Sequence, residues 1–599
     1  MKSFPLFILF LFVLLEGKKG IKGWAQSVSY PFLRAIMKAI FLSKGLEVAE
    51  TPNTTDSDVH IFTQFFVHKN TSRNEELRHC MKQNHDNPHV AHIHLLNERI
   101  YTPEEMGLPG SAHKVHQEVI GKRLSFQSVF QYIREQKLKG YFVLVNADIF
   151  LDDTLKYLRA TTLHEKKQFL ALLRYEYNPS TMTTSTAPLF GPRFDSQDTW
   201  IFHSNFGLKM SQEKLFGFDF GRPGCDNKIV YLMRVLGYDL FNDPKTIRTY
   251  HYHRSIMRDY FGKDVVPQPW GALVPAGVNV MAIPPSLGIN LVDVCRTTQG
   301  FQQVMFDDHR LLYDYIAGKL SKGQPFVVPR IAGIENNFAV FARLKQQTNK
   351  PDFDGYFNQV GPAMKANAGV MLTTWASIVK YSDMYLKAFD HCDMYSGWEV
   401  QGEVFKHIAQ SHEYIRTNYP SKSIFWAFAL DIFHYVYDPK AWTKSLRGKR
   451  ILIVSPFEES IRERVPKRAL LFDGVDLFPE CQFEYIKPPM TQAGEPSREF
   501  DVELAEFCQR LDALKDKYDV ALVSCGGYGN LVCNYIFENH HKSAIYVGGV
   551  LQMYFGVLGG RWLKERADVV RLFLNEHWAR PKVSERPKNC EAIEQACYW

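Results

Sequence analysis

Apolar and polar positions along residues 57–261 follow two alternating patterns. Short apolar runs predict buried strands, and apolar residues at helical spacing between them predict helices. The predicted strands are residues 59–67, 92–96, 141–145 and 169–174, and the predicted helices are residues 74–83 and 125–136. Strands and helices that alternate at this spacing indicate βαβ units and a mainly parallel sheet. We therefore expect a first α/β domain over residues 57–261.

A second alternation of the same kind follows a stretch of different composition. Residues 262–325 are rich in Pro, Gly and Val and are expected to connect two domains. Beyond them, apolar runs predict strands at residues 326–331, 450–455, 520–524 and 544–547. A chain of 599 residues is also too long for one ordinary domain. We expect a second α/β domain over residues 326–599.

The first 45 residues differ from the rest of the chain. Lys2 precedes an apolar run, residues 4–15, which is short for a membrane span and has the length of a signal-peptide core. A second stretch, residues 30–42, has apolar residues at helical spacing and two basic side chains, as in helices that lie on membrane surfaces. A signal peptide, a short anchor, an interfacial helix and a helix packed on the first domain are all open. We expect residues 1–45 to associate with a membrane, which places the protein in the secretory pathway, facing the envelope or on the cytoplasmic face.

Charge and cysteine content exclude several classes of protein. The chain has 71 Lys+Arg against 64 Asp+Glu, and its net charge of +7 suits an anionic ligand or a membrane surface. It has no dense Lys/Arg tract, so we expect no nucleic-acid partner. Its ten cysteines form no CxxC pair, which argues against structural zinc and thioredoxin-type redox chemistry. Their low density favours reduced thiols over a disulfide framework.

The strand predicted at residues 141–145 runs straight into polar residues, Asn146 and Asp148 among them. A buried strand that ends in a carboxylate places that carboxylate at the carboxyl edge of a sheet, where α/β proteins bind ligands. Carboxylates there suit a hard divalent cation, which prefers oxygen ligands and keeps positions free for phosphate. In the alternative interpretation, Asp148 closes the strand in an Asx turn and Asp152 caps a helix at residues 153–160.

Three further features belong to the same domain. Asp198 enters an apolar strand, Asp226 opens a helix at residues 228–236, and a short strand ends in His251 and His253, which share one face. Each has a structural alternative, such as a helix N-cap for Asp226. Together they are the parts of a metal-dependent nucleotide-sugar transferase. In such an enzyme the cation neutralises the diphosphate, a carboxylate deprotonates the acceptor hydroxyl, and a histidine completes the metal shell or contacts the diphosphate.

Residues 59–260 resemble GT-A-fold glycosyltransferases. Asn146-Ala147-Asp148 resembles their DxD-type metal motif, with Asn146 in place of the first acid, and Gly224-Cys225-Asp226 resembles their xED motif. Four segments in order also resemble uncharacterised viral and bacterial glycosyltransferases: residues 146–149, 196–202, 223–227 and 250–255.

This resemblance implies a Rossmann-like domain that uses a nucleotide-sugar donor, Mn²⁺ or Mg²⁺, and a glycan acceptor. The residues it implies for binding the donor and cofactor are Asn146, Asp148 and Asp198. The metal ligands it implies are Asp148, His251 and His253. Asp226 corresponds to the catalytic base of inverting members, so the resemblance favours an inverting first domain.

A second group of candidate residues follows two predicted strands of the second domain: Arg330, Glu335, Gly526, Gly527 and Gly529. A glycine-rich turn exposes backbone N–H groups to a phosphate, although tight strand–helix turns need glycine in any case. The order of these segments resembles the GT-D class of glycosyltransferases, in whose RxGDGE segment Gly333 here takes the place of the aspartate. The resemblance implies a second Rossmann-like domain. In it Glu335 would be a catalytic base or metal ligand, and Arg330 and the glycines would bind the donor.

These features lead to one main hypothesis and two alternatives. The main hypothesis is a glycosyltransferase with two transferase domains, which moves a hexosyl or deoxyhexosyl group from a nucleotide sugar to a glycan or glycoconjugate in polysaccharide synthesis. The first alternative is a non-catalytic protein that binds nucleotide or glycan in degenerate domains, as Asn146 and Gly333 suggest. The second is a methyltransferase that uses the turn at residues 526–530. Ser524-Cys525-Gly526 lacks the acidic residue and glycine spacing usual in a methyl-donor site.

Overall fold

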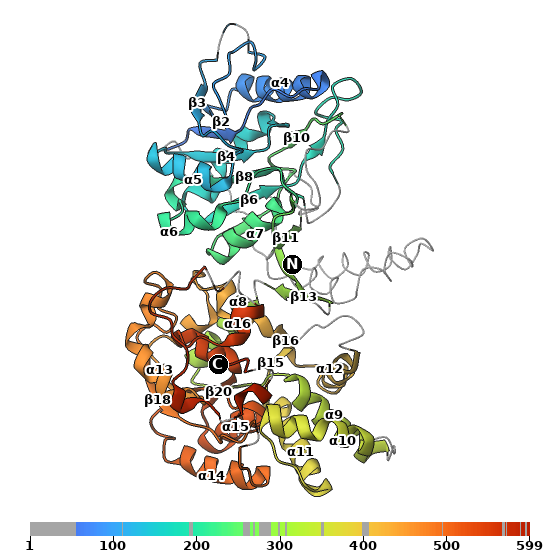
Figure 1. Ribbon diagram of the computed structural model, residues 1–599, viewed down its shortest axis with the longest axis vertical. Helices are drawn as coiled ribbons and strands as arrows, with labels where there is room; N and C mark the ends of the chain where they lie inside the picture. The colour runs from blue at the N-terminus through green and yellow to red at the C-terminus, as the bar shows by residue number, and fades with distance from the viewer. Residues whose placement is uncertain are drawn as a thin grey trace.

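The computed structural model shows two α/β lobes stacked along the long axis of the molecule, with the N-terminal lobe at the top of Figure 1. It describes residues 56–108, 110, 112–190, 196–255, 264–267, 270–274, 289–297, 300–305, 308–348, 353–397, 406–493, 495–565, 570, 572–587, 589–593 and 596–599. The segment predicted to associate with a membrane, residues 1–45, lies outside these ranges. Within them, no helix has both the length and the apolar character needed to cross a membrane.

The first lobe is built on a seven-stranded sheet. Its order is β3 (Val115–Val119), β2 (His92–Asn97), β1 (Val59–Thr63), β4 (Tyr141–Val145), β8 (Thr199–His203), β6 (Gln168–Leu172) and β9 (Asp239–Phe241). The first four strands are parallel, in agreement with the mainly parallel sheet expected, although β3 itself was not predicted. In contrast, β8 runs antiparallel to both β4 and β6. Because β8 is reversed, its first residue lies beside the last residue of β4.

Side chains of β1 and β4 alternate between two apolar cores, as the two-residue period of a strand requires. Val59 and Val143 pack on one face with helix α4 (Thr71–Asp86). Phe62 and Phe142 pack on the other face with α5 (Phe126–Glu135) and α7 (Cys225–Val235). Helices therefore cover both faces of the sheet, as in the α/β class that the sequence predicts.

A small three-stranded sheet extends the carboxyl edge of the large one. Its central strand, β10 (Thr249–His251), is antiparallel to β5 (Ile149–Leu151) and parallel to β7 (Tyr175–Glu176). β5 follows β4 in the chain, and β7 follows β6. The small sheet thus brings together the segments that follow β4 and β6 of the large sheet.

The predicted connector, residues 262–325, contains regular structure of its own. β11 (Gly271–Val274), β12 (Ile289–Thr297) and β13 (Gly300–Met305) form an antiparallel sheet, and α8 (Asp308–Ser321) follows. Gly271 packs on α7, since a Cβ at that position would lie 3.0 Å from the backbone nitrogen of Tyr231. Figure 1 places β11 and β13 between the two lobes. Composition alone did not predict this sheet.

The second lobe has a five-stranded, fully parallel sheet. Its order is β14 (Val327–Val328), β20 (Ser543–Tyr546), β19 (Val520–Val523), β17 (Arg450–Val454) and β18 (Gln482–Ile486). The first four overlap the predicted strands. The sequence did not predict β18, because most of its side chains are half-buried or exposed and form no apolar run.

Four helices share a core with one face of this second sheet: α9 (Gly333–Thr348), α11 (Trp375–His391), α14 (Phe500–Asp512) and α15 (Gly529–Tyr535). A parallel pair, β15 (Met394–Gly397) and β16 (Ser423–Trp426), joins the chain two residues after β14, through a bridge between Arg330 and Ser396. The other α-helices in the described ranges are α6 (Met210–Glu213), α10 (Phe353–Ala363), α12 (Lys406–Asn418), α13 (Glu458–Arg464) and α16 (Gly560–Glu565).

Candidate active site

Asp148 and two histidines converge at the carboxyl edge of the first sheet. Asp148 lies between β4 and β5, and His251 ends β10, where it pairs with Ile149. Nε2 of His251 and Nδ1 of His253 each lie 3.4 Å from Oδ2 of Asp148. One possible ligand atom from each of the three residues lies within 4.8 Å of the other two. The structure therefore brings the three predicted metal ligands together.

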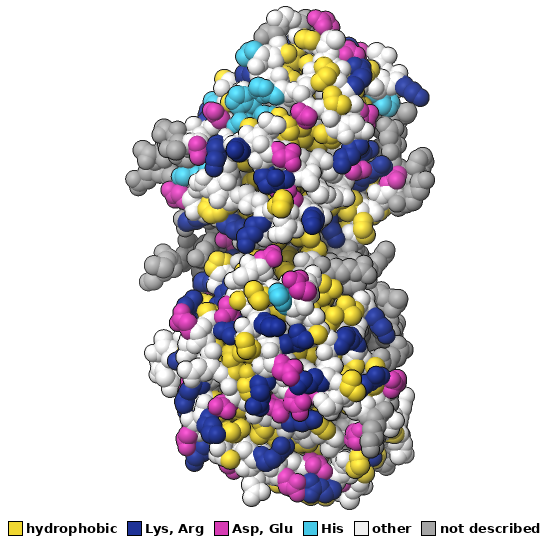
Figure 2. All heavy atoms as spheres, turned by 60° about the vertical axis from the view of Figure 1, so that its left-hand side comes forward, with side chains coloured by type: hydrophobic (Ala, Val, Ile, Leu, Met, Phe, Trp, Pro, Cys, Tyr) yellow, Lys and Arg dark blue, Asp and Glu magenta, His cyan; other side chains and the backbone are white. Residues whose placement is uncertain are grey.

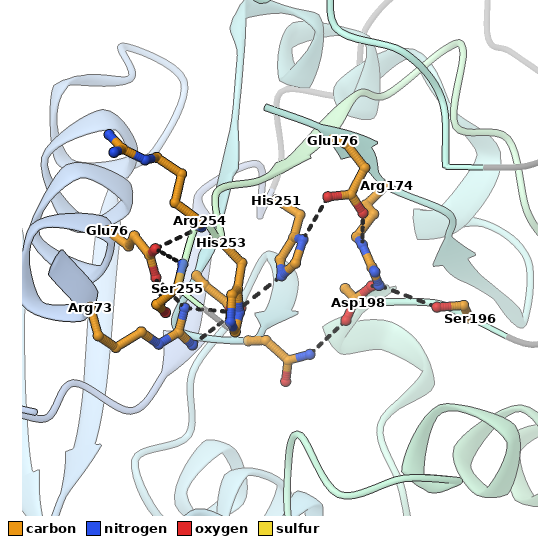
Figure 3. Close-up of polar contacts among 12 residues, drawn as sticks. Arg73, Glu76, Arg174, Glu176, Ser196, Asp198, His251, His253, Arg254 and Ser255 are labelled. Atoms are coloured by element: carbon orange, nitrogen blue, oxygen red, sulfur yellow. Dashed lines mark hydrogen bonds and ion pairs between the residues drawn. The ribbon is translucent and has the colours of Figure 1, made fainter. Parts of the chain in front are cut away.

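A cation that the sequence did not predict shares this carboxylate. Arg73, in α4, donates from Nη2 to Asp148 at 2.7 Å and from Nη1 to Glu76 at 2.8 Å. Glu76 also accepts hydrogen bonds from the backbone N–H groups of Arg254 and Ser255, at 2.6 and 2.7 Å. Figure 3 shows Arg73 and Glu76 on the helix side of this group. Helix α4 thus holds the segment after β10 and adds a positive charge beside Asp148.

The charges around Asp148 keep it ionised. Burial would raise the pKa of Asp148, but His251, His253 and Arg73 beside it lower this pKa well below its usual value. Burial would likewise lower the pKa of His251, but Asp148 and Glu176 raise it to about 9. In the absence of a metal, the positive charge at this carboxylate therefore comes from the protein's own side chains.

The donor set fits a divalent cation. A carboxylate oxygen and two imidazole nitrogens are ligands that Mn²⁺ and similar ions accept. Glu176 lies behind His251, with Oε2 3.1 Å from Nδ1 of His251 (Figure 3). The other ring nitrogen, Nε2, is then left for Asp148, whose Oδ2 lies 3.4 Å away. A carboxylate behind a metal-binding histidine fixes its ring and tautomer. Asp148, His251 and His253 are thus the residues that would hold the ion.

Asn146 and Asp198 form a second polar group next to this one. Nδ2 of Asn146 donates to Oδ1 of Asp198 at 2.8 Å, and Arg174 is hydrogen-bonded to the other oxygen. Arg174 also donates to Glu176 at 2.8 Å, which links Asp198 to the carboxylate behind His251. Asp198 reaches this edge because β8 is antiparallel and begins there. The structure places both predicted residues beside the candidate metal ligands.

Asp226 lies in the first turn of α7. It does not cap the helix as the alternative interpretation proposed, because the N-cap residue is Gly224, whose φ is +83°. The ring of Trp270 lies 3.2 Å from where a Cβ of Gly224 would stand, so a side chain at this cap would displace the indole. Burial and the nearby charge of Asp198 raise the pKa of Asp226 to about 7. A carboxyl group that titrates near neutrality suits a general base.

The other capping alternative holds for Asp152. Its Oδ1 accepts a hydrogen bond from the backbone N–H of Thr154 at 2.9 Å. The segment it caps, Asp153–Ala160, is a helix of the 3₁₀ type. Asp152 therefore has a structural role, whereas Asp148 faces the histidines and Arg73.

The predicted residues of the second lobe also meet at the carboxyl edge of their sheet. The backbone N–H of Arg330, after β14, donates to Oδ1 of Asn530 at 3.0 Å, and Nδ2 of Asn530 donates back to the Arg330 carbonyl at 3.0 Å. Tyr381 donates to the carbonyl of Gly527 at 2.8 Å, and burial and the nearby Glu335 raise the pKa of this tyrosine. Burial also raises the pKa of Glu335 itself.

The glycines of this turn are packed against protein atoms. A Cβ at Gly527 would lie 2.3 Å from Cγ2 of Val370, and one at Gly529 would lie 2.3 Å from the ring of Tyr546. Gly526 has a φ of +54°, in the region that favours glycine. Close packing and backbone conformation thus explain the three glycines without a ligand, which favours the tight-turn alternative over a phosphate site.

Sequence reasoning missed four residues of the first site: Arg73, Glu76, Arg174 and Glu176. Arg174 follows the strand β6, so the strand-end argument that pointed to Asp148 applied to it as well. Arg73 and Glu76 lie on a helix, and nothing in the sequence shows which turn of α4 faces β10.

Comparisons with known proteins give no family for this chain. No family model matches it, and a search of curated proteins finds no match. Similar solved structures include the mannosyltransferase PcManGT from Pyrobaculum calidifontis in complex with GDP-Man and Mn²⁺, at 12% identity and a TM-score of 0.26. They also include GalNAc-T7 with UDP, GalNAc and Mn²⁺, at 14% identity and a TM-score of 0.24. Each match covers 38% of this chain, and they cover 66% and 53% of those two chains.

Proposed function

We propose that this protein is a glycosyltransferase whose first lobe binds a nucleotide-sugar donor through a divalent cation. The observation that carries the proposal is the meeting of Asp148, His251 and His253 at the carboxyl edge of the sheet, where α/β proteins bind ligands. Asp226 in the same lobe supplies a carboxyl group with a pKa of about 7. A metal site and a separate candidate base are the two parts that transfer from a sugar diphosphate requires.

Different residues of the first lobe carry out different parts of the reaction. Asp148, His251 and His253 hold the cation, which supplies positive charge to the diphosphate when bound. Arg73 adds a second positive charge at the same edge. Ionised Asp226 takes the proton from the acceptor hydroxyl. The acceptor oxygen then bonds to the anomeric carbon as the bond from that carbon to the phosphate oxygen breaks, and the nucleoside diphosphate leaves. Direct attack of this kind inverts the anomeric carbon.

Exchange of Asp148 for asparagine tests the proposal. Thermal shift with a panel of nucleoside diphosphates, with and without Mn²⁺, measures binding. A ligand at about one hundred times its Kd stabilises the wild type by about 2.7 kcal/mol. Asp148→Asn should lose the Mn²⁺-dependent part of this shift. It should also melt below the wild type, because the buried pair with Arg73 is lost, and a cooperative melt of the variant shows that it is folded.

Asp153→Asn is the matched control, because its carboxylate is exposed and pairs with Lys156 on the surface. It should bind as the wild type does. An unchanged Mn²⁺-dependent shift in Asp148→Asn would refute the proposed metal site.

A non-catalytic binder is the second candidate, favoured by one observation. Asn146 stands in place of an acid and binds Asp198, so only Asp148 supplies a carboxylate from this motif. A binder and an enzyme would both show the thermal shift, but only the enzyme would turn over the nucleotide sugar. Release of free sugar from the nucleotide sugar that gives the largest shift identifies the enzyme. Binding without any release or transfer identifies the binder.

We propose the second lobe as a further transferase domain of the GT-D type, supported by Arg330 and the buried Glu335 at one sheet edge. Glu335→Gln in the full chain should lower transfer to a glycan acceptor and leave the Mn²⁺-dependent shift of the first lobe intact. Unchanged transfer in this variant would show that Glu335 is not a catalytic residue. We also propose that residues 1–45 hold the protein at a membrane, which vesicle co-sedimentation with and without this segment tests.

A further inference from the structure

The start of the first sheet carries four histidines on one face. His60 lies in β1, His92 and His94 in β2, and His116 in β3. The parallel register pairs His60 with His92 and His94 with His116, so all four side chains point to the face covered by α5. The rings of His60 and His92 are stacked at 4.8 Å, and those of His94 and His116 at 5.2 Å. Figure 2 shows a group of histidine side chains at the surface of this lobe.

This cluster is separate from the candidate active site. His60 and His92 lie at the start of their strands, whereas Asp148 lies beyond the end of β4, a strand parallel to β1 and next to it. The two groups therefore stand at opposite edges of the same sheet, and the glycosyltransferase chemistry proposed above uses none of these histidines.

The buried half of the cluster is held in a fixed tautomer. Nε2 of His60 donates to the carbonyl of Lys139 at 2.9 Å, so Nδ1 of His60 is the acceptor in its 3.0 Å contact with Nε2 of His94. Nδ1 of His94 in turn accepts from the hydroxyl of Tyr132 at 3.2 Å. His60 and His94 are 4% exposed, so these contacts place both rings without water.

The outer half of the cluster is accessible and differently bonded. His116 is exposed and His92 is half-buried, and Nδ1 of His92 lies 3.0 Å from Nε2 of His116. If His92 is the donor in this contact, its Nε2 keeps a free lone pair. The exposed Asp58 stands beside it, because possible ligand atoms of Asp58, His60 and His92 all lie within 4.8 Å of one another.

We propose that Asp58, His60 and His92 form a second metal site, which binds a transition-metal ion of the zinc, nickel or copper type. Two imidazoles and a carboxylate are ligands of such ions, and ligand bonds of about 2.0–2.2 Å require only a small closing movement of the exposed Asp58 and half-buried His92. His116 then accepts the Nδ1 proton of His92, the outer contact that metal-bound histidines usually make. If the ion binds Nδ1 of His60, it takes the place of the hydrogen bond from His94. The proton of His94 then moves from Nε2 to Nδ1, and Nδ1 donates it to the hydroxyl oxygen of Tyr132.

Zinc titration of the full chain tests this site. The protein is stripped with EDTA and carries Asp148→Asn, so that the site at the other edge of the sheet is impaired. Calorimetry should show one Zn²⁺ bound per chain, and adding His92→Ala should abolish this binding. Adding His541→Asn, which removes an exposed histidine of the second lobe, should leave it unchanged. Co²⁺ in place of Zn²⁺ should give visible absorption bands that disappear in the same variant.

His116→Ala provides a second variant in case His92→Ala unfolds. It removes an outer contact and keeps all three ligands, so the affinity for Zn²⁺ should fall by about 10- to 100-fold. Two results would overturn the proposal. One is the absence of bound Zn²⁺ once Asp148 is replaced, which would assign all metal binding to the candidate active site. The other is equal Zn²⁺ affinity with and without His92.

Discussion

Asp226 shows how one buried side chain sets a pH dependence. Burial and the charge of Asp198 raise its pKa from 3.8 to about 7. As a general base it must be ionised, so we expect kcat/KM to rise with pH and reach a plateau above about pH 7. Asp226→Asn should lower turnover by about 10²- to 10⁴-fold and remove this rise. A pH series of initial rates for both proteins measures the effect, and an unchanged rise in the variant would assign it to another group.

The same pKa has the opposite effect on stability. The folded protein binds the proton of Asp226 more tightly than the unfolded chain does. The stability that comes from this raised pKa is therefore fully present below about pH 4 and is lost as pH rises through about 7. Asp226→Asn keeps a neutral group at all pH values. The variant should therefore melt several degrees above the wild type at pH 8 and close to it at pH 4. Thermal melts at both pH values measure this, and equal melting at pH 8 would mean that the burial of the charge costs little.

At the scale of elements, the glycines in the turn after β19 have two explanations, close packing and ligand binding, and a substitution can separate them. Gly529 begins α15, and a Cβ there would lie 2.3 Å from the ring of Tyr546. Gly529→Ala should therefore cost about 1–3 kcal/mol in unfolding free energy through overpacking. Gly318→Ala, within α8, is the control, because a Cβ there has no atom within 4 Å. That change should stabilise the protein by about 0.8–1 kcal/mol. Denaturant titration compares the two variants. A loss of stability in both would mean that replacing a helical glycine is itself destabilising here, and would contradict overpacking at Gly529 as the cause.

Elements whose side chains are buried on both faces were predictable, and their directions were not. The apolar run of β4 gave its bounds, Tyr141–Val145, because a run of this length between Gly140 and Asn146 is typical of a buried strand. The run of β8 looks the same in either direction, so the sequence did not show that it is reversed. Asp148 and the histidines were found because they end strands, whereas Arg73 and Glu76 were missed because packing alone selects which turn of α4 reaches β10.

At the scale of the whole molecule, the two lobes are joined through α7. Asp438 of the second lobe accepts hydrogen bonds from Arg234, near the end of α7, and from Arg310 of α8, at 3.1 and 2.7 Å. His309 lies 2.9 Å from the same oxygen. Arg234, His309 and Asp438 have side chains that are 2% exposed, and one apolar core contains residues of both lobes. The lobes therefore share buried structure at the end of α7 opposite to Asp226.

Loss of the charge on Asp438 should weaken both the fold and the reaction. Asp438→Asn leaves Arg234 buried without its counter-charge, which costs about 3–5 kcal/mol when a buried pair is broken. The displaced α7 should also lower turnover while the pH at which the rate reaches its plateau stays near 7, because Asp226 itself is unchanged. Asp314→Asn is the control, because its pair with Lys440 is exposed, and it should cost less than about 1 kcal/mol. Denaturant unfolding and initial rates measure the two effects. If Asp438→Asn is as stable as the control, the buried charges around Asp438 contribute little to holding the two lobes together.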